Sequence, residues 1–279
     1  MKVGLQVFAT DETLRPDEIA VLAEDHEFES LWFPDHTHLP ARTRSRHPGG
    51  HAELPREYAR NLDVFVALTA AALATRDLKV GTGICLVPQR DPIVTAKTVA
   101  SVDHLSGGRV LFGVGAGWNH EELQNHGVDP AQRFGLLRDR VAAMKAIWAD
   151  DVAGYHGRYT SFDPIMSWPK PAQRPWPRLL LGANGPRAVR SALAMEADWL
   201  PGRHKDHAGL VARVREFREL SKQRLGVTLA DPCLDRDRLS ELADAGAERA
   251  FFLVQASSRD MVERRMEEIK KIVDGVASG

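Results

Sequence analysis

Short apolar runs alternate with amphipathic stretches along the whole chain of 279 residues. The apolar runs predict eight strands, at Lys2–Phe8, Glu29–Pro34, Leu78–Ile84, Arg109–Gly115, Arg178–Ala183, Ala197–Leu200, Val227–Ala230 and Glu248–Val254. Apolar positions at helical spacing predict eight helices, at Pro16–Glu27, Leu62–Ala74, Pro92–Leu105, Pro130–Ala149, Arg187–Glu196, Ala208–Leu225, Asp235–Ala245 and Arg259–Val276. Eight strand–helix units fit a closed parallel barrel better than an open sheet. The sequence therefore predicts a TIM (β/α)8 barrel with insertions, in a single domain over residues 1–279.

Two stretches are too long to be plain connections of such a barrel, and loops of this length are usually lids or binding loops. Residues 37–61 follow the second predicted strand, so we expect an insertion on the active face. Residues 150–177 follow the helix after the fourth strand, which places their start at the opposite face. They are long enough to fold back over the barrel, and the sequence does not decide whether they reach the active site.

Composition narrows the possible partners. The 37 basic and 38 acidic residues leave a formal charge of −1, which gives no electrostatic footprint for nucleic acid or a membrane surface. The long apolar run Val64–Ala74 is far shorter than the roughly 20 residues that a membrane-spanning helix needs. With two cysteines, Cys85 and Cys233, and no signal-peptide pattern, we expect a cytoplasmic protein.

Catalytic groups of barrel enzymes lie at the C-terminal ends of strands. The second predicted strand ends in Asp35-His36, a titratable pair in which histidine can exchange a proton while the carboxylate orients it. A structural histidine is the alternative. His36 and His38 also have the H-x-H spacing of some metal-dependent barrel hydrolases, but the later strand ends offer few further ligands, so we expect no metal.

Two glycine-containing strand ends suggest a cofactor site. After the fifth strand, Gly182-Ala183-Asn184-Gly185-Pro186 precedes a helix and could bind a phosphate through backbone N–H groups, or could be a plain turn. The run Gly113–Gly117 is not a dinucleotide fingerprint, because Trp118 occupies the sixth position. It is interpreted as a backbone that lies close to a flat ligand with Trp118 as a wall, or as glycines that relieve crowding. Cys85 has no base near it in sequence and is expected to pack.

A larger set of motifs resembles one known family. The segment Leu78–Glu122 contains Val80-Gly81-Thr82-Gly83, Arg90-Asp91-Pro92, Ala96-Lys97, Asp103, Leu105-Ser106-Gly107-Gly108-Arg109 and Gly113-Val114-Gly115-Ala116-Gly117-Trp118-Asn119. Further matches are Ser30–His36, Leu181–Pro186 and Ala197-Asp198-Trp199. Together these motifs resemble the luciferase-like monooxygenase family, in particular its deazaflavin (coenzyme F420) oxidoreductases. The resemblance covers roughly residues 1–201.

The resemblance implies a bacterial-luciferase-like barrel that holds a flavin or deazaflavin ring across its strand ends. It implies a bulge after the third strand, with a cis peptide between Gly83 and Ile84 that presses behind the ring. It makes His36 and Asp35 the candidate catalytic residues. The candidate cofactor-binding residues are Gly83, Ile84, Cys85, Gly115, Gly117, Trp118, Gly182, Ala183, Asn184 and Gly185.

The leading hypothesis is hydride transfer between F420 and an unidentified small organic substrate. The loop of residues 37–61 supports F420, because arginines at positions 42, 44, 46, 56 and 60 could meet its phosphate and oligoglutamate tail, although a solvated charged loop is the alternative. Three alternatives remain open. They are an FMN-dependent monooxygenase with a flavin or F420 reductase partner, a metal-dependent hydrolase, and a barrel that binds cofactor without turnover. The family implies a homodimer or larger homo-oligomer.

Overall fold

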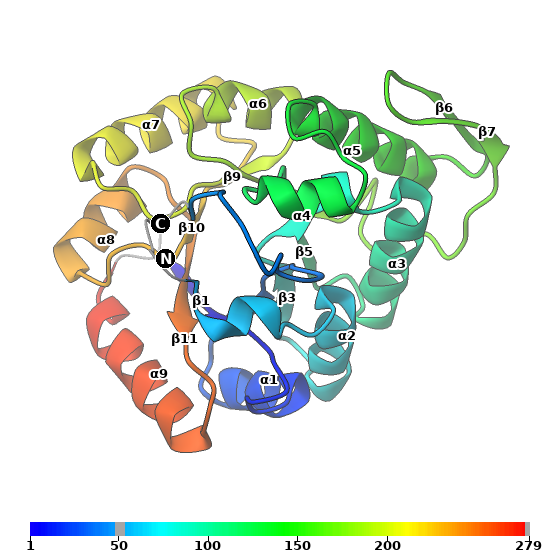
Figure 1. Ribbon diagram of the computed structural model, residues 1–279. Helices are drawn as coiled ribbons and strands as arrows, with labels where there is room; N and C mark the ends of the chain where they lie inside the picture. Colours follow the sequence, from blue (N-terminus) through cyan, green and yellow to red (C-terminus); the bar gives the residue numbers. More distant parts are fainter. Residues whose placement is uncertain (48–53, 277–279) are drawn as a thin grey trace.

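The computed structural model describes residues 1–47 and 54–276 (Figure 1). In this part of the chain, eight parallel strands form the TIM (β/α)8 barrel that the sequence predicts. These strands are β1 (Lys2–Val7), β2 (Ser30–Phe33), β3 (Lys79–Thr82), β5 (Val110–Gly115), β8 (Arg178–Gly182), β9 (Asp198–Leu200), β10 (Thr228–Ala230) and β11 (Arg249–Val254). A two-residue strand, β4 (Cys85–Leu86), also pairs with β5.

The helices cover the outside of this ring (Figure 1). They are α1 (Pro16–Asp25), α2 (Val64–Ala74), α3 (Pro92–Leu105), α5 (Arg133–Ala149), α6 (Ala188–Ala194), α7 (His207–Leu220), α8 (Arg236–Asp244) and α9 (Arg259–Val273). The short helix α4 (His120–Asn125) lies across the barrel mouth, and two 3-10 turns occur at Arg56–Ala59 and Val87–Gln89. The predicted helix Pro130–Ala149 begins three residues later than expected, and α4 was not predicted.

The ring closes through the first and last strands of the chain. β1 pairs with β2 on one side and with β11 on the other, in a register that runs from Lys2 opposite Arg249 to Val7 opposite Val254. On the far side, β9 and β10 meet through a Trp199–Val227 bridge and a hydrogen bond from Ala230 N to the Pro201 carbonyl, 2.8 Å long. The strand order is therefore that of a nearly closed barrel.

Strand alternation divides the apolar side chains into two groups. Residues that point outward pack against the helices and form the large core. Those that point inward form a smaller cluster of Trp32, Leu111, Leu180, Leu200 and Phe251, which come from five different strands. The rings of Trp32 and Phe251 stack at 4.6 Å between centroids. The barrel interior is thus filled by side chains.

An ion pair joins the N-terminal ends of the strands. Arg249 in β11 is fully buried, and its guanidinium donates to both carboxylate oxygens of Glu29, at 2.7 and 2.6 Å. Lys79 in β3 donates to the same carboxylate at 2.8 Å. Burial by itself would raise the pKa of Glu29, but the two cations lower it to about 2. Glu29 therefore links the second, third and last strands of the barrel.

The two predicted insertions differ in structure. The loop of residues 37–61 lies on the active face wherever the structure describes it. Positions 48–53, among them Glu53, lie outside the described residues. In residues 150–177 the structure contains an antiparallel hairpin, β6 (Ala153–His156) and β7 (Ser161–Ile165), which the sequence did not predict. The hairpin lies beside α5, outside the barrel (Figure 1).

Across residues 1–47 and 54–276, no helix combines the length and the apolar character that crossing a membrane requires.

The Glu29–Arg249 pair predicts an acid-sensitive barrel. Glu29→Gln leaves the buried Arg249 without its counter-charge and should lower the free energy of unfolding at pH 7 by about 3–5 kcal/mol. Because the folded pKa lies below the unfolded value, Glu29 stabilises the fold above pH 4.5 and loses this effect as the pH falls toward 2. Urea unfolding at several pH values measures both effects.

Asp17→Asn is the matched control, because Asp17 pairs with Arg15 at the surface, where such pairs contribute about 0–1 kcal/mol. Equal effects of Glu29→Gln and Asp17→Asn would contradict the prediction.

Candidate active site

His36 forms a buried pair with Glu122 at the barrel mouth. His36 follows β2, and Glu122 lies in α4, the helix after β5. The imidazole Nδ1 lies 2.9 Å from Glu122 Oε2, and the side chains are 7% and 0% exposed. With Nδ1 facing the carboxylate, Nε2 is the nitrogen that can exchange a proton with a bound molecule. Glu122 was not among the predicted site residues.

Asp35 does not orient His36, so this part of the prediction is wrong. Its carboxylate accepts hydrogen bonds from Leu86 N at 2.9 Å and from the Arg90 guanidinium at 2.9 and 2.6 Å. Arg90 in turn donates to Asp63, which caps α2. Successive residues of an extended chain point in opposite directions, so Asp35 turns outward where His36 turns to the mouth. Asp35 therefore fixes the segment after β3.

The bulge after β3 contains the expected cis peptide between Gly83 and Ile84. Gln6 Nε2 donates to the Gly83 carbonyl at 2.6 Å, and Gly83 N donates to the Phe33 carbonyl at 2.8 Å. The bulge is thus bonded to two neighbouring strands.

Ile84 occupies the space that the glycines leave open. A methyl group added at Gly115 would lie 2.0 Å from Ile84 Cδ1, and one at Gly182 would lie 2.8 Å from it. Gly115 and Gly182 therefore face Ile84, so at Gly115 the side chain of Ile84 fills the space where a close approach of a flat ligand was expected. Gly117, with φ of +80°, turns the chain from β5 toward Trp118. A flat ligand over the bulge would contact Ile84.

Cys85 lies behind this surface. It is fully buried in the core between strands and helices, as the packing interpretation expected. Burial and the adjacent Asp35 carboxylate raise the pKa of its thiol. Because Cys85 has no accessible surface, we remove it from the candidate cofactor contacts.

Aromatic side chains surround His36. The Tyr58 ring lies 5.3 Å from the His36 ring and the Trp118 ring lies 6.0 Å from it, between centroids. His47 lies 5.2 Å from the Trp118 ring, and its Nε2 is 2.9 Å from the Tyr58 hydroxyl. Burial and the nearby Glu57 charge raise the pKa of Tyr58 to about 12. His47 and Tyr58 come from the first insertion and were not predicted; their only signal was their place in that loop.

The predicted phosphate turn lies at the end of β8. Gly182 and Ala183 are half-buried, whereas Asn184 and Gly185 are exposed. Asn184 Oδ1 accepts from Gly202 N at 2.8 Å, and the Arg213 guanidinium donates to the Asn184 and Gly185 carbonyls at 2.9 and 2.8 Å. Because α6 begins at Ala188, this turn lies ahead of the first residue of the helix. An anion bound there would contact the turn, with Arg213 beside it.

The H-x-H pair does not form a metal centre. His38 lies 2.9 Å from both Thr37 Oγ1 and Asn125 Nδ2, while His36 faces Glu122. The described residues contain no group of three or more His, Cys, Asp or Glu side chains placed to hold a metal ion.

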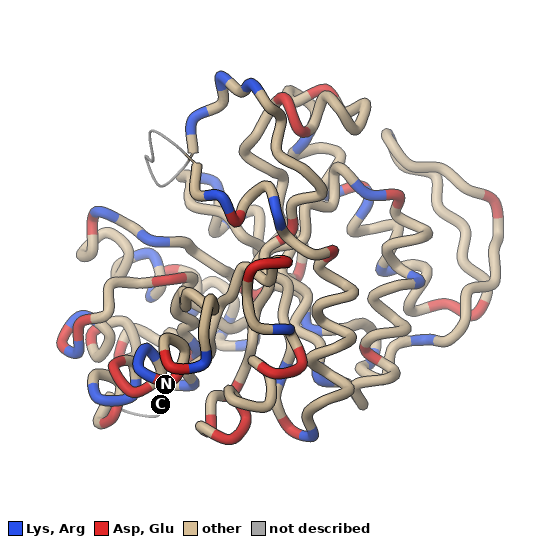
Figure 2. The backbone as a smooth tube through the Cα atoms, turned by 60° about the horizontal axis from the view of Figure 1, so that its bottom comes forward, with Lys and Arg blue, Asp and Glu red and all other residues tan. Residues whose placement is uncertain are grey.

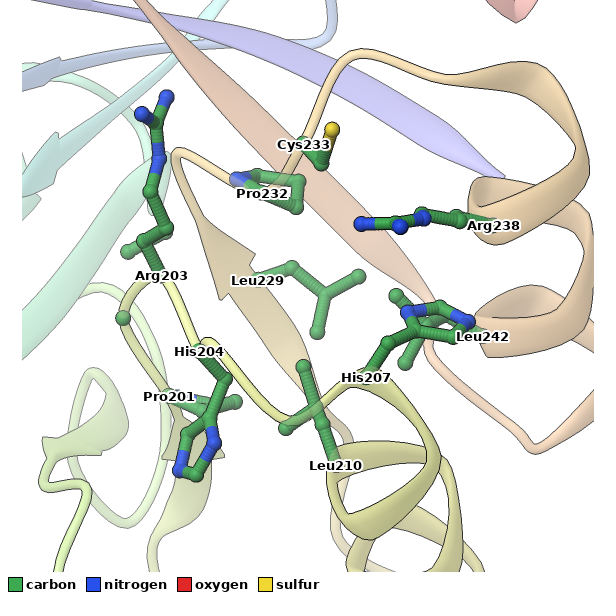
Figure 3. A pocket seen from close by; sticks show the side chains of 12 residues that line it. Pro201, Arg203, His204, His207, Leu210, Leu229, Pro232, Cys233, Arg238 and Leu242 are labelled. Carbon is green, nitrogen blue, oxygen red and sulfur yellow. The ribbon is translucent and has the colours of Figure 1, made fainter.

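The described residues form a cleft and a smaller cavity at the ends of the strands. A cleft of about 540 Å³ beside Trp118 is lined by Arg44, Ser45, Arg46, Trp118, His120, Glu121, Gln124 and Pro130. The other, between the loops after β9 and β10, contains Arg203, His204, His207, Cys233 and Arg238 (Figure 3). Its cavity of about 20 Å³ has room for about one water molecule, so it cannot hold a substrate.

Comparisons with known proteins agree with this geometry. A family description of luciferase-like monooxygenases matches residues 13–272. An uncharacterized protein of Mycobacterium tuberculosis is 42% identical over 203 residues, which are 72% of each chain. The structure of an F420-dependent secondary alcohol dehydrogenase superposes with a TM-score of 0.74 and 19% identity, over 99% of both chains.

Two relatives use different cofactors. An FMNH2-dependent dimethylsulfone monooxygenase of Pseudomonas putida is 31% identical over 57% of this chain and 45% of its own. An F420-dependent glucose-6-phosphate dehydrogenase of Amycolatopsis mediterranei is 30% identical over 69% of this chain and 54% of its own. Since the family description covers nearly the whole chain, this protein belongs to the luciferase-like monooxygenase family, whose members are F420- or FMN-dependent oxidoreductases and monooxygenases.

Proposed function

We propose that this protein binds coenzyme F420 and transfers a hydride between its ring and a small organic substrate, with His36 as the proton donor or acceptor. The observation that carries the proposal is the buried His36–Glu122 pair beside the Gly83–Ile84 bulge. A buried carboxylate on Nδ1 fixes the ring orientation, which leaves Nε2 for the substrate. Glu122 thereby takes the orienting role that Asp35 does not have.

The residues at the mouth fit a deazaflavin. Ile84 offers an apolar platform, Trp118 a wall, and the turn Gly182–Gly185, exposed at Asn184 and Gly185, a place for the phosphate. Among the described residues, Glu122 Oε1 and Asn119 Nδ2 are buried without a hydrogen-bond partner, so the mouth has polar atoms for a further group. When bound, the cofactor would supply the hydride chemistry. The chain's own residues would orient the reactants, exclude water and move the proton.

The charges of the first insertion favour F420 over FMN. Figure 2 shows Lys and Arg on the chain at both sides of the grey trace. Arg56 and Arg60 pair with Glu12 and Asp11, so their charges are already balanced. Arg42, Arg44 and Arg46 are exposed, and Arg44 and Arg46 line the cleft beside Trp118. The Arg44 guanidinium has only a long pair with Glu121, at 3.9 Å. They can meet an oligoglutamate tail, which FMN lacks.

The proton-transfer role predicts the effect of two substitutions. His36→Asn should lower turnover about 10²–10⁴-fold, because a general acid–base group contributes that much, and should leave F420 affinity nearly unchanged. Glu122→Gln should have a smaller effect and alter the pH profile of kcat/KM. The assay follows the deazaflavin absorbance with a panel of secondary alcohols and phosphorylated sugars, the substrate classes of two relatives. Full turnover by His36→Asn would exclude the role.

The arginine hypothesis predicts a selective loss of affinity. Replacing Arg42, Arg44 and Arg46 with Ala should raise the Kd for F420 about tenfold or more, if each lost surface contact contributes about 0.5–1 kcal/mol, and should leave the Kd for FMN unchanged. Arg56→Ala is the control, because Arg56 is paired with Glu12. Fluorescence titration measures each Kd. Equal F420 affinity in the triple variant and the wild type would remove the hypothesis.

An FMN-dependent two-component monooxygenase with a separate reductase partner is the second candidate, favoured by the 31% identity to the dimethylsulfone enzyme. Tighter binding of FMN than of F420, together with oxygen consumption by the protein with reduced FMN, would favour this candidate. Binding of neither cofactor would contradict both.

We also propose that a second copy of this chain covers α2. Its residues, Val64–Ala74, carry no charge, and a helix that is apolar all round is normally buried. Yet Val66 and Leu73 are each 64% exposed, and Val94 of the adjacent α3 is 63% exposed. A two-fold contact through α2 brings no charges of that helix together, and the net charge of −1 opposes association little.

Leu73→Glu should convert a dimer to a monomer in light scattering at micromolar concentration, because it buries a charge in the contact. Leu220→Glu on α7, across the barrel from α2, is the matched control and should leave the dimer intact (Figure 1). A monomeric wild type would refute the proposal.

A further inference from the structure

The short helix α4 connects several parts of the mouth. Glu121 accepts hydrogen bonds from Thr43 Oγ1 at 2.9 Å, Arg44 N at 2.9 Å and Ser45 Oγ at 2.6 Å, so it holds the first insertion. The next residue, Glu122, faces His36. The position of α4 therefore determines whether Glu122 lies within hydrogen-bond distance of His36.

A helix of this length does not hold its own position. Its six residues allow few internal hydrogen bonds, and helices so short are marginal in isolation. Tertiary contacts must place it. Leu123 is the fully buried apolar residue of α4, and it belongs to a cluster of Leu123, Val128 and Leu136 that is separate from the main core.

The aromatic member of this cluster comes from the second insertion. Tyr159, at the tip of the β6–β7 hairpin, packs against it. The sequence left open whether residues 150–177 reach the active site; their tip packs against the cluster that includes Leu123 of α4, the helix that carries Glu122. The hairpin contributes no residue to the candidate cofactor contacts.

The tip itself is firmly attached to α5. The Asp139 carboxylate accepts hydrogen bonds from Arg158 N at 3.1 Å, Tyr159 N at 3.0 Å and the Tyr155 hydroxyl at 3.2 Å. Gly135 in α5 leaves room for the Tyr159 ring, since a methyl group there would lie 2.9 Å from it. The hairpin thus presents a fixed aromatic ring to the cluster of Leu123, Val128 and Leu136.

We propose that Tyr159 is a positioning residue, which holds Leu123 and thereby keeps Glu122 in contact with His36. The Tyr159 ring, and not the hydroxyl, has this positioning effect, because the cluster against which it packs is apolar and consists of Leu123, Val128 and Leu136. Its importance for turnover rests on the proposed function, but its effect on the pair exists in the protein without cofactor.

The test is the NMR signal of the His36 Nδ1 proton in the free protein labelled with 15N-histidine. Glu122→Gln assigns the signal, because it changes the acceptor. Tyr159→Phe should keep the signal of the wild type. Tyr159→Ala should exchange this proton with solvent at least ~10-fold faster, because the contact that limits local opening is lost. Tyr159→Leu keeps an apolar side chain, so its exchange rate should lie between those of Tyr159→Phe and Tyr159→Ala. It replaces the alanine variant in the test if that variant does not fold.

Phe162→Ala is the matched control. Phe162 is another aromatic of the hairpin, but it packs on the main core, so its loss weakens the hairpin and leaves α4 in place. Unchanged exchange in Tyr159→Ala or Tyr159→Leu overturns the proposal, and so does equally fast exchange in Phe162→Ala.

A double-mutant cycle then connects the pair to turnover. The loss of kcat caused by Tyr159→Ala should disappear in the Glu122→Gln background, because the ring acts through that carboxylate. Full additivity overturns the proposal. If exchange responds as expected while His36→Asn keeps full turnover, the positioning role stands and the proposed proton transfer fails.

Discussion

The rest of the structure depends on closure of the barrel, and closure depends on contacts between the two ends of the chain. Glu29 and Arg249 are 220 residues apart in sequence, yet their side chains form a two-pronged ion pair in the wall of the ring. The adjacent pairing of β1 with β11 supplies the backbone hydrogen bonds for the same junction. Once the ring is closed, every strand ends on one rim, and residues as distant as His36 and Glu122 become neighbours.

The mouth is built by a division of roles between adjacent residues. Asp35 and His36 are neighbours in sequence, but the first holds Arg90 and the backbone of Leu86, and the second faces the site. Glu121 and Glu122 likewise have different partners. Glu121 is bonded to the arginine-rich loop and Glu122 to His36. In both pairs one member holds the backbone and the other belongs to the His36–Glu122 pair.

The strand and helix patterns predicted the barrel because buried apolar strands alternate with helices along the chain. α4 was missed because six mostly polar residues contain too little periodicity, and the hairpin was missed because its strands are mostly exposed and carry no apolar run. The glycine-containing strand ends were read from the sequence directly, and the cis peptide was expected from the family resemblance. Spacing could not reveal the His36–Glu122 pair, since 86 residues separate them, and neighbourhood in sequence wrongly favoured Asp35.

The inward-facing apolar cluster has a consequence for how this fold can change. Trp32, Leu111, Leu180, Leu200, Phe251 and the Ile84 above them separate the charged base of the barrel from its mouth. Charges at the two ends therefore influence each other little, and substitutions in the two regions should combine additively. New specificities can evolve on the loops of the mouth while the base continues to secure the fold.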